Sequence, residues 1–369
     1  MAVLSMAVLL QVAARGEVYF DPPGGTGVWD NDTANWNGGL ATWPANGNAV
    51  FNGAGSAVTI GDNLEIGSLT LSATAGSYTF NNTVGAMMDF NGAGIATGGA
   101  ASQTFNNTGI INFNAGASAG TATVSFDNQG DLTFSGAGAT AGSAQLANSG
   151  NLNFESGSTA GSASINNLGN LLLSGSANGG SATVSNGSTF DISDASGTVT
   201  LGSLTNSAIY PGPQALNGAI TLGLNTLQVS GPVSLATTLG SGNNSLSFEL
   251  DTPTTSGAIA LAGLLTGSAS GMTDISLTST GPVAAGAYVL LDWSAGSATG
   301  VELSDFNLTG PLPAGVGPGS YLDIIGGNQL ALIAVPEPGA FALVMAGIVG
   351  MAVSRPRRTR TVRPNPVRR

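Results

Sequence analysis

The sequence predicts an all-β fold, a right-handed parallel β-solenoid of about 20 residues per coil, followed by a single C-terminal transmembrane helix. Three observations support this. A short motif repeats at nearly constant spacing in the middle of the chain, glycine accounts for 57 of 369 residues, and an apolar run near the C-terminus precedes a cluster of arginines. Charged residues make up only 8% of the chain, which argues against a highly charged disordered polymer.

The repeat occupies residues 81–188 and is clearest from residue 109 onward. Each copy holds two short runs in which apolar and polar residues alternate, the pattern of a β-strand, separated by Ala-Gly or Gly-Gly corners. Because one coil cannot bury its inward face alone, we expect the coils to stack. The alternative, a disordered Gly/Ser-rich linker, leaves the aligned apolar positions unexplained.

Three sets of residues recur from copy to copy, and we expect each set to stack in a column. The first set has spacings of 21, 20 and 19 residues. A looser copy of the motif is expected around Phe90 and Phe105. The sets are Phe113, Phe134, Phe154 and Leu173; Val124, Leu146, Ile165 and Val184; and the turn residues Asn128, Asn148, Asn167 and Asn186.

This block resembles the Ala-Gly-Ser/Thr-Ala repeats of autotransporter-like bacterial surface proteins. Ala141-Gly-Ser-Ala and Ala160-Gly-Ser-Ala carry the resemblance. It implies a surface-exposed β-helix and no particular chemistry.

The N-terminal part divides into two segments. Residues 1–14 are apolar and end in Val12-Ala13-Ala14, a small-residue cleavage site, so we expect a signal peptide there despite the missing cationic start; a buried first strand is the alternative. Residues 15–80 are expected to form a Trp-rich β cap. Trp29, Trp36 and Trp43 either shield the end of the solenoid or stack on sugar rings, and we favour the cap.

Strand patterning continues through residues 189–334, where the repeat itself fades. We expect an irregular solenoid here, with a separate β-sandwich as the alternative and Pro211-Gly-Pro213 as a candidate boundary. Leu322–Ile325 and Gln329–Ile333 are expected to form a final hairpin across Gly326-Gly327-Asn328.

Residues 335–369 form a distinct tail. It begins with Val335, Pro336, Glu337 and Pro338, continues with an apolar run at residues 340–353, and ends in a basic segment that includes Arg355, Arg357, Arg358 and Arg360. The run is expected to be the transmembrane helix, although it is shorter than the roughly 20 residues that a self-sufficient span needs. The arginines are expected to hold that end in the cytoplasm. An ordinary single-span anchor is the alternative.

The tail resembles the PEP-CTERM sorting signal of exported proteins in Gram-negative bacteria, with the proline motif, the short apolar run and the arginines in the same order. This resemblance implies recognition and removal of the tail by an exosortase. It also implies export to the cell surface or extracellular matrix, with transient anchoring in the inner membrane through the tail. The stretch from Thr361 to Arg369 is longer than such tails usually have.

The sequence offers little for catalysis. It has no Cys and no His, so thiol nucleophiles, imidazole bases and histidine metal sites are excluded. Two acids suffice for glycoside hydrolysis, which leaves the pairs Asp127 with Asp131 and Asp191 with Asp194 formally open; turn-forming roles explain them equally well. Asp30-Asn31-Asp32 supplies too few oxygen ligands for calcium. We expect no enzyme activity, no cofactor and no metal.

Basic residues are confined to the ends of the chain. All eight lie at Arg15 or from Arg355 onward, so residues 16–354 contain no Lys or Arg. Such a body cannot neutralise phosphates, which excludes nucleic acid as a partner.

From the tail and the repeats together, we expect an exported structural protein. A carbohydrate-binding adhesin that uses its tryptophans, with extracellular polysaccharide as the partner, is the alternative, and a glycoside hydrolase on a β-helix scaffold is a weaker one. Asn-x-Ser/Thr sites occur at Asn31, Asn81, Asn106, Asn186, Asn243 and Asn307.

Overall fold

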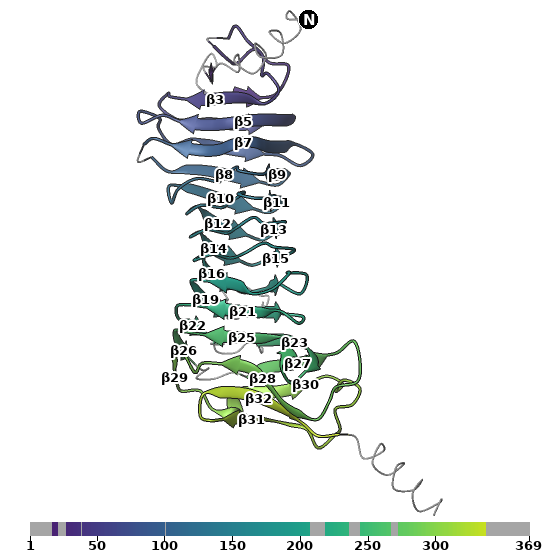
Figure 1. Ribbon diagram of the computed structural model, residues 1–369. Helices are drawn as coiled ribbons and strands as arrows, with labels where there is room; N and C mark the ends of the chain where they lie inside the picture. Colours follow the sequence, from purple (N-terminus) through teal and green to yellow (C-terminus); the bar gives the residue numbers. More distant parts are fainter. Residues whose placement is uncertain are drawn as a thin grey trace, which may run out of the picture.

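The chain forms an elongated all-β rod built of stacked parallel strands (Figure 1). The computed structural model describes residues 17–20, 27–37, 39–99, 101–206, 218–235, 244–266 and 272–336. Within these ranges the only helical element is a 3-10 turn, η1 (Leu303–Asp305). The predicted all-β fold of the β-solenoid type is therefore confirmed.

Two long sheets run along the rod and a shorter third sheet joins them toward the C-terminal end. Sheet 1 contains, in spatial order, β1 (Glu17–Tyr19), β3 (Gly47–Phe51), β5 (Asn63–Leu71), β7 (Met87–Thr97), β9 (Ile110–Phe113), β11 (Asp131–Ser135), β13 (Asn151–Glu155), β15 (Asn170–Leu173), β17 (Thr189–Asp191), β20 (Ala219–Thr221), β23 (Asn244–Thr252), β27 (Thr273–Thr278) and β30 (Phe306–Thr309), with β24 (Thr255–Ser256) paired to β23.

Sheet 2 contains β2 (Gly27–Trp29), β4 (Ala57–Ile60), β6 (Thr79–Asn82), β8 (Gln103–Asn107), β10 (Val124–Asn128), β12 (Gln145–Asn148), β14 (Ser164–Asn167), β16 (Thr183–Asn186), β19 (Ser203–Asn206), β22 (Val233–Ser234), β26 (Leu264–Thr266) and β29 (Ser297–Thr299). Sheet 3 contains β18 (Val199–Leu201), β21 (Thr226–Val229), β25 (Ala258–Leu261), β28 (Gly286–Asp292), β32 (Gln329–Ala334) and β31 (Tyr321–Ile325).

Each regular coil passes through a strand of sheet 1, a corner, a strand of sheet 2 and a second, tight corner. The first corner carries single parallel bridges that join Ser118 to Thr140, Thr140 to Thr159, and Thr159 to Asn178. From β18 onward, the strands of sheet 3 occupy this place in the coil. Parallel pairing continues without a break across residues 80 and 188, so the described strands after residue 188 extend the sheets of the regular repeat.

The rod ends in antiparallel structure. β28 pairs antiparallel with β32, and β32 pairs antiparallel with β31, which forms the hairpin expected across Gly326-Gly327-Asn328. Among the described strands, the hairpin therefore forms the C-terminal edge of sheet 3.

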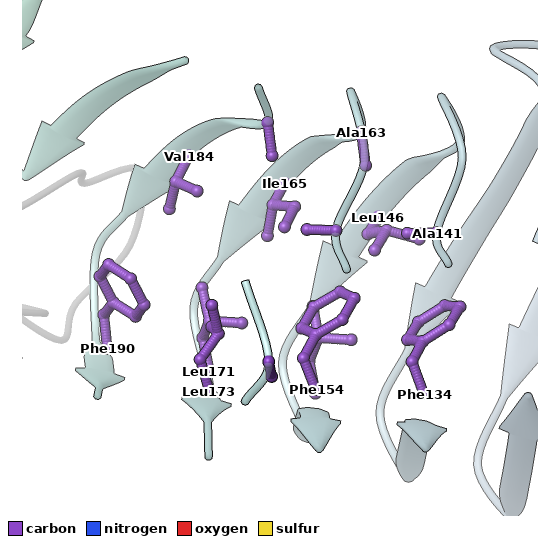
Figure 2. Close-up of a cluster of buried hydrophobic side chains, with 14 of the residues drawn as sticks. Phe134, Ala141, Leu146, Phe154, Ala163, Ile165, Leu171, Leu173, Val184 and Phe190 are labelled. Atoms are coloured by element: carbon purple, nitrogen blue, oxygen red, sulfur yellow. The ribbon is translucent and has the colours of Figure 1, made fainter. Parts of the chain in front are cut away.

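The inward side chains of sheet 1 form the column that the repeat predicts. The rings of Phe113 and Phe134 stack with centroids 4.9 Å apart, and those of Phe134 and Phe154 stack at 4.8 Å. Leu173 is in register with Phe154 (Figure 2). Phe90 stacks on Phe113 at 4.6 Å, so the looser copy extends this column toward the N-terminus. The separations match the spacing between strands, which places one ring in each coil.

The second column needs a correction. Leu146, Ile165 and Val184 are in register (Figure 2), but the residue paired with Leu146 in the preceding coil is Phe126, and Val124 pairs with Gln103 instead. The physical reason is the length of the first corner. From the bridge position to the ladder asparagine, the coil of Ser118 and Asn128 uses two more residues than the coil of Thr140 and Asn148. Aligning the coils on their Ala-Gly corners therefore misplaces the following strand by two residues.

Several predicted segments lie outside the described residues. These are the signal peptide at residues 1–14, the boundary at Pro211-Gly-Pro213, and the tail beyond Pro336, including the apolar run at 340–353. Among the residues that the structure does describe, no helix is long and apolar enough to cross a membrane.

Candidate functional site

The three tryptophans form a buried aromatic cluster at the N-terminal end of the core. Trp29 and Trp36 are fully buried and Trp43 is 4% exposed. The ring of Trp29 lies 5.2 Å from that of Trp36 and 4.9 Å from that of Trp43, in edge-to-face arrangements. Phe20 and Phe51 complete the cluster. The indole faces are covered by protein, so stacking of these residues on sugar rings, which the sequence suggested as an alternative, is wrong for this structure.

The cluster has the properties of an end cap. β2, which carries Trp29, is the first strand of sheet 2, and the indole of Trp43 donates a hydrogen bond to the carbonyl oxygen of Glu65 at 3.1 Å. Large aromatic side chains at this position cover the first coil, which has no preceding parallel coil within the described residues.

The members of the two acidic pairs lie on either side of turns, and Asp194 lies in the turn that follows Asp191. Asp127 lies on β10 of sheet 2 and Asp131 on β11 of sheet 1, on opposite sides of the tight corner. Asp131 accepts a hydrogen bond from the side chain of Asn151 at 2.7 Å. Asp191 accepts one from the backbone N–H of Ser193 at 2.8 Å, the turn-forming role that was its alternative interpretation.

The acidic loop at the N-terminal end is also structural. Oδ1 of Asp30 accepts hydrogen bonds from the backbone N–H groups of Asp32 and Thr33, and its Oδ2 accepts one from the hydroxyl of Thr33. These bonds fix a turn. Within the described residues, no group of three or more acidic side chains is placed to hold a metal ion.

Three hollows lined by described residues are small, with cavity volumes of about 120, 80 and 180 Å³. Small-molecule sites are roughly 300–1,000 Å³. The largest of the three is lined by Asp127 together with Asn148 and other neutral residues, so it offers one carboxylate. None of these three hollows is lined by the two carboxylates that glycoside hydrolysis uses.

The main polar feature of the interior is a ladder of buried asparagines at the tight corner. Asn128, Asn148, Asn167 and Asn186 are in register and hydrogen-bonded through their side chains, as predicted. The ladder is longer than predicted, because Asn82, Asn107 and Asn206 continue it in both directions. Each of these three asparagines is the last residue of a strand of sheet 2, the same place that the four predicted members occupy, so their position after an alternating run could have identified them. Burial of Asn186 removes it as a glycosylation acceptor.

Hydrogen bonding shifts the pKa of one carboxyl near the end of the rod. Burial raises the pKa of Asp292, but hydrogen bonds from Ser294 and Gln329 outweigh it, so the pKa lies below its ordinary value. The Nε2 atom of Gln329 donates to this carboxylate at 3.0 Å and links β32 to β28. Burial likewise raises the pKa of the Tyr288 hydroxyl, which donates to the carbonyl of Ala284. A hydrogen bond to Glu17 raises the pKa of Tyr19.

The tail motif is described only at its start. The backbone N–H of Val335 donates to the hydroxyl of Ser320 at 2.8 Å, and its carbonyl accepts from the N–H of Gly317 at 2.7 Å. Pro336 forms an antiparallel bridge with Val316. Glu337, Pro338 and the arginines Arg355, Arg357, Arg358 and Arg360 lie outside the described residues.

The sequence reasoning missed one surface. The outward side chains of sheet 2 are mostly uncharged hydroxyl and amide groups, with a few apolar ones such as Val28 and Leu264, whereas those of sheet 1 include most of the acids of the strands. The alternation within each strand was readable from the sequence, but the assignment of successive strands to two separate faces was not made.

No protein-family model, curated protein or solved structure matches this chain.

Proposed function

We propose that this chain is an exported structural rod of the cell surface or extracellular matrix, which an exosortase sorts and releases by cleaving its C-terminal tail. The observation that supports this most is the connection of the rod to the tail. β32 is held between β28 and β31, and the next two residues, Val335 and Pro336, are bound to the 316–320 segment. The motif that resembles the sorting signal therefore starts where the rod ends.

The form of the rod fits a structural role. Sheet 1 stacks thirteen strands in one path, which corresponds to a length of roughly 60 Å at 4.8 Å per strand. Its core is one continuous cluster of apolar side chains from Val18 to Ala334. Such a rod holds its two ends far apart, and each coil needs only apolar inward residues and tight corners. Its acidic, cation-free body stays soluble through self-repulsion.

The tail supplies the membrane steps of the proposal. The apolar run at residues 340–353 would hold the precursor in the inner membrane, and the arginines behind it would remain on the cytoplasmic side. The segment around Glu337 and Pro338 would then lie at the outer face of the inner membrane, where the protease would bind it. Right-handed winding of the coils is part of the same proposal, since parallel crossovers take that hand in most proteins.

The test is the intact mass of the protein recovered from the surface or medium fraction of its native host. We expect a C-terminus near residues 336–339, with or without added hexoses. A Pro336→Ala, Pro338→Ala variant should retain the tail, whereas the matched variant Pro282→Ala, an exposed proline outside the motif and outside the 316–320 segment, should be processed normally. An unmodified chain that keeps Arg355 to Arg369 and stays in the inner membrane would show that the tail is a plain anchor.

A further inference from the structure

The two long faces of the rod differ in charge. Side chains that are not buried alternate with core side chains along each strand, so they point outward. On sheet 1 these outward positions include nine acids, whereas the strands of sheet 2 hold only Asp127. The nine are Glu17, Glu65, Asp89, Asp131, Glu155, Asp191, Glu249, Asp251 and Asp274.

The outer face of sheet 2 is an ordered array of small polar groups. From β6 to β19 it presents two columns, with one residue of each column per strand. The first column is Thr79, Thr104, Ser125, Gln145, Ser164, Thr183 and Ser203; the second is Asn81, Asn106, Asp127, Ala147, Asn166, Ser185 and Thr205. Hydroxyl and amide groups both donate and accept hydrogen bonds, so this face is complementary to another copy of itself.

From these observations we propose that the outer face of sheet 2 docks against the same face of a second copy of this chain, which makes a two-fold symmetric dimer of rods. The proposal does not depend on export or on processing of the tail. We call the outward residues of β4 to β29 the neutral face.

Charge favours the neutral face over the face of sheet 1. Residues 16–354 contain no Lys or Arg and the chain has no His, so no cation is available in the rod to neutralise an acid across an interface. Contact through sheet 1 would oppose carboxylates of both copies, and like charges brought together in an interface repel each other. Contact through the neutral face brings together uncharged groups, with one acid per copy.

The dimensions are sufficient. Eleven strands from β4 to β29 at 4.8 Å, each about 13 Å wide, give roughly 700 Å² per copy and about 1,400 Å² in total. Stable specific interfaces bury about 1,200–2,000 Å². Two copies also share the same strand spacing, so columns of one copy remain in step with columns of the other along the axis. Stacked sheets with in-step polar columns form tight interfaces in other β assemblies.

A polysaccharide chain fits this face less well. Sugar recognition relies on aromatic side chains that pack on the apolar faces of the ring, and neither column contains an aromatic residue. The tryptophans of the chain that could serve are buried in the cap.

The test is sedimentation equilibrium of the full chain, with every sample in the same mild non-ionic detergent so that the tail contributes equally. We expect a monomer–dimer equilibrium that strengthens with added salt, because salt screens the repulsion between two acidic rods. Replacing Ser164→Glu and Ser203→Glu, two coils apart on the neutral face, should raise the dissociation constant at least about tenfold. The matched control, Thr133→Glu with Leu172→Glu, places the same charges on sheet 1 and should raise it less than about twofold.

A covalent readout keeps the result independent of folding defects. The chain has no Cys, so one introduced cysteine reports one position. Ser164→Cys should give a covalent dimer with a bismaleimide, and Thr133→Cys should not. A chain that stays monomeric at all concentrations, or a dimer that both glutamate pairs weaken equally, would overturn the proposal. A monomer that binds a neutral glucan through Ser164 and Ser203 would assign the face to a sugar chain and overturn it as well.

Discussion

The Nδ2 atom of Asn148 lies 2.7 Å from the Oδ1 atom of Asn167, and this one bond is a step of a ladder that crosses seven coils from Asn82 to Asn206. The same Nδ2 atom also donates to the carbonyl oxygen of Asn170 at 2.9 Å. From Asn82 to Asn186, each buried amide thus donates two hydrogen bonds to the next coil, which accounts for the presence of polar side chains inside an otherwise apolar core.

Substitution of one ladder residue should therefore destabilise the rod. Asn148→Ala removes the donor to Asn167 and Asn170 and the acceptor for Asn128. We expect a loss of about 2–3 kcal/mol in the free energy of unfolding, since buried polar groups are left without partners. Asn166→Ala, an exposed position on the neighbouring strand β14, should cost less than about 0.5 kcal/mol. Chemical denaturation of both variants measures the difference, and equal losses would contradict the ladder's role.

The tight corners require glycine for a steric reason. A Cβ atom added at Gly150 would lie 2.2 Å from the carbonyl oxygen of Gly130 in the coil below, and one added at Gly169 would lie 2.3 Å from that of Gly150. Both neighbours are backbone atoms, which cannot rotate away. The corners therefore stack backbone directly on backbone.

Gly150→Ala should accordingly lower the stability of the rod by about 1–3 kcal/mol, the usual cost of overpacking, or more if the coil must separate from its neighbour. Gly281→Ala is the matched control, because a Cβ atom there meets nothing within 4 Å and its φ is not left-handed. The thermal midpoint of Gly281→Ala should stay close to that of the unmodified chain. A similar midpoint for Gly150→Ala would mean that adjacent coils can move apart at this corner.

The Trp cap should behave as core. Trp36 is fully buried against Phe20, Trp29 and Trp43. Trp36→Ala is expected to cost about 3–5 kcal/mol in the free energy of unfolding, because it leaves a large cavity. Leu40→Ala, at a side chain 88% exposed in the same region, should cost almost nothing. If Trp36→Ala keeps its stability and instead loses binding on a glycan array, the cap interpretation fails.

The sequence was sufficient where one residue type recurs at a fixed place in the coil. The column of Phe113, Phe134 and Phe154 and the central part of the asparagine ladder follow from spacing, because stacked coils must place equivalent residues in register. It was insufficient where corner length varies. Two extra residues in the corner after Ser118 place Phe126, and not Val124, in the second column. A shift of two residues keeps the alternation of apolar and polar positions, so the sequence pattern does not reveal it.

The candidate site was harder to predict for a similar reason. Whether Trp29, Trp36 and Trp43 point into the core or toward solvent depends on the path of loops rich in Gly, Asn and Pro, which have no periodicity. The neutral face of sheet 2 depends on which strands share a sheet, and that is a property of the coil and not of any one strand. Local patterning determines strands, whereas the faces of a rod are determined by how consecutive strands are assigned to sheets.

The carboxylate that joins the last strands should make the C-terminal end of the rod sensitive to acid. The pKa of Asp292 is lower in the folded chain than its ordinary value, because hydrogen bonds from Ser294 and Gln329 outweigh burial. A lowered folded pKa stabilises the fold fully above the ordinary carboxyl pKa of about 4, and this contribution is lost as the pH falls through the lowered value.

Asp292→Asn removes the ionisable group, so as the pH falls from neutral through the acid range the stability of the variant should depend less on pH than that of the unmodified chain, and the two should converge in acid. Gln329→Ala keeps the carboxyl but removes one hydrogen bond, so its acid dependence should lie between the two. Unfolding free energies measured by denaturant titration at several pH values test this order. If Asp292→Asn keeps the full pH dependence, other carboxylates are responsible, and the bond between β28 and β32 does not control the acid response of this end of the rod.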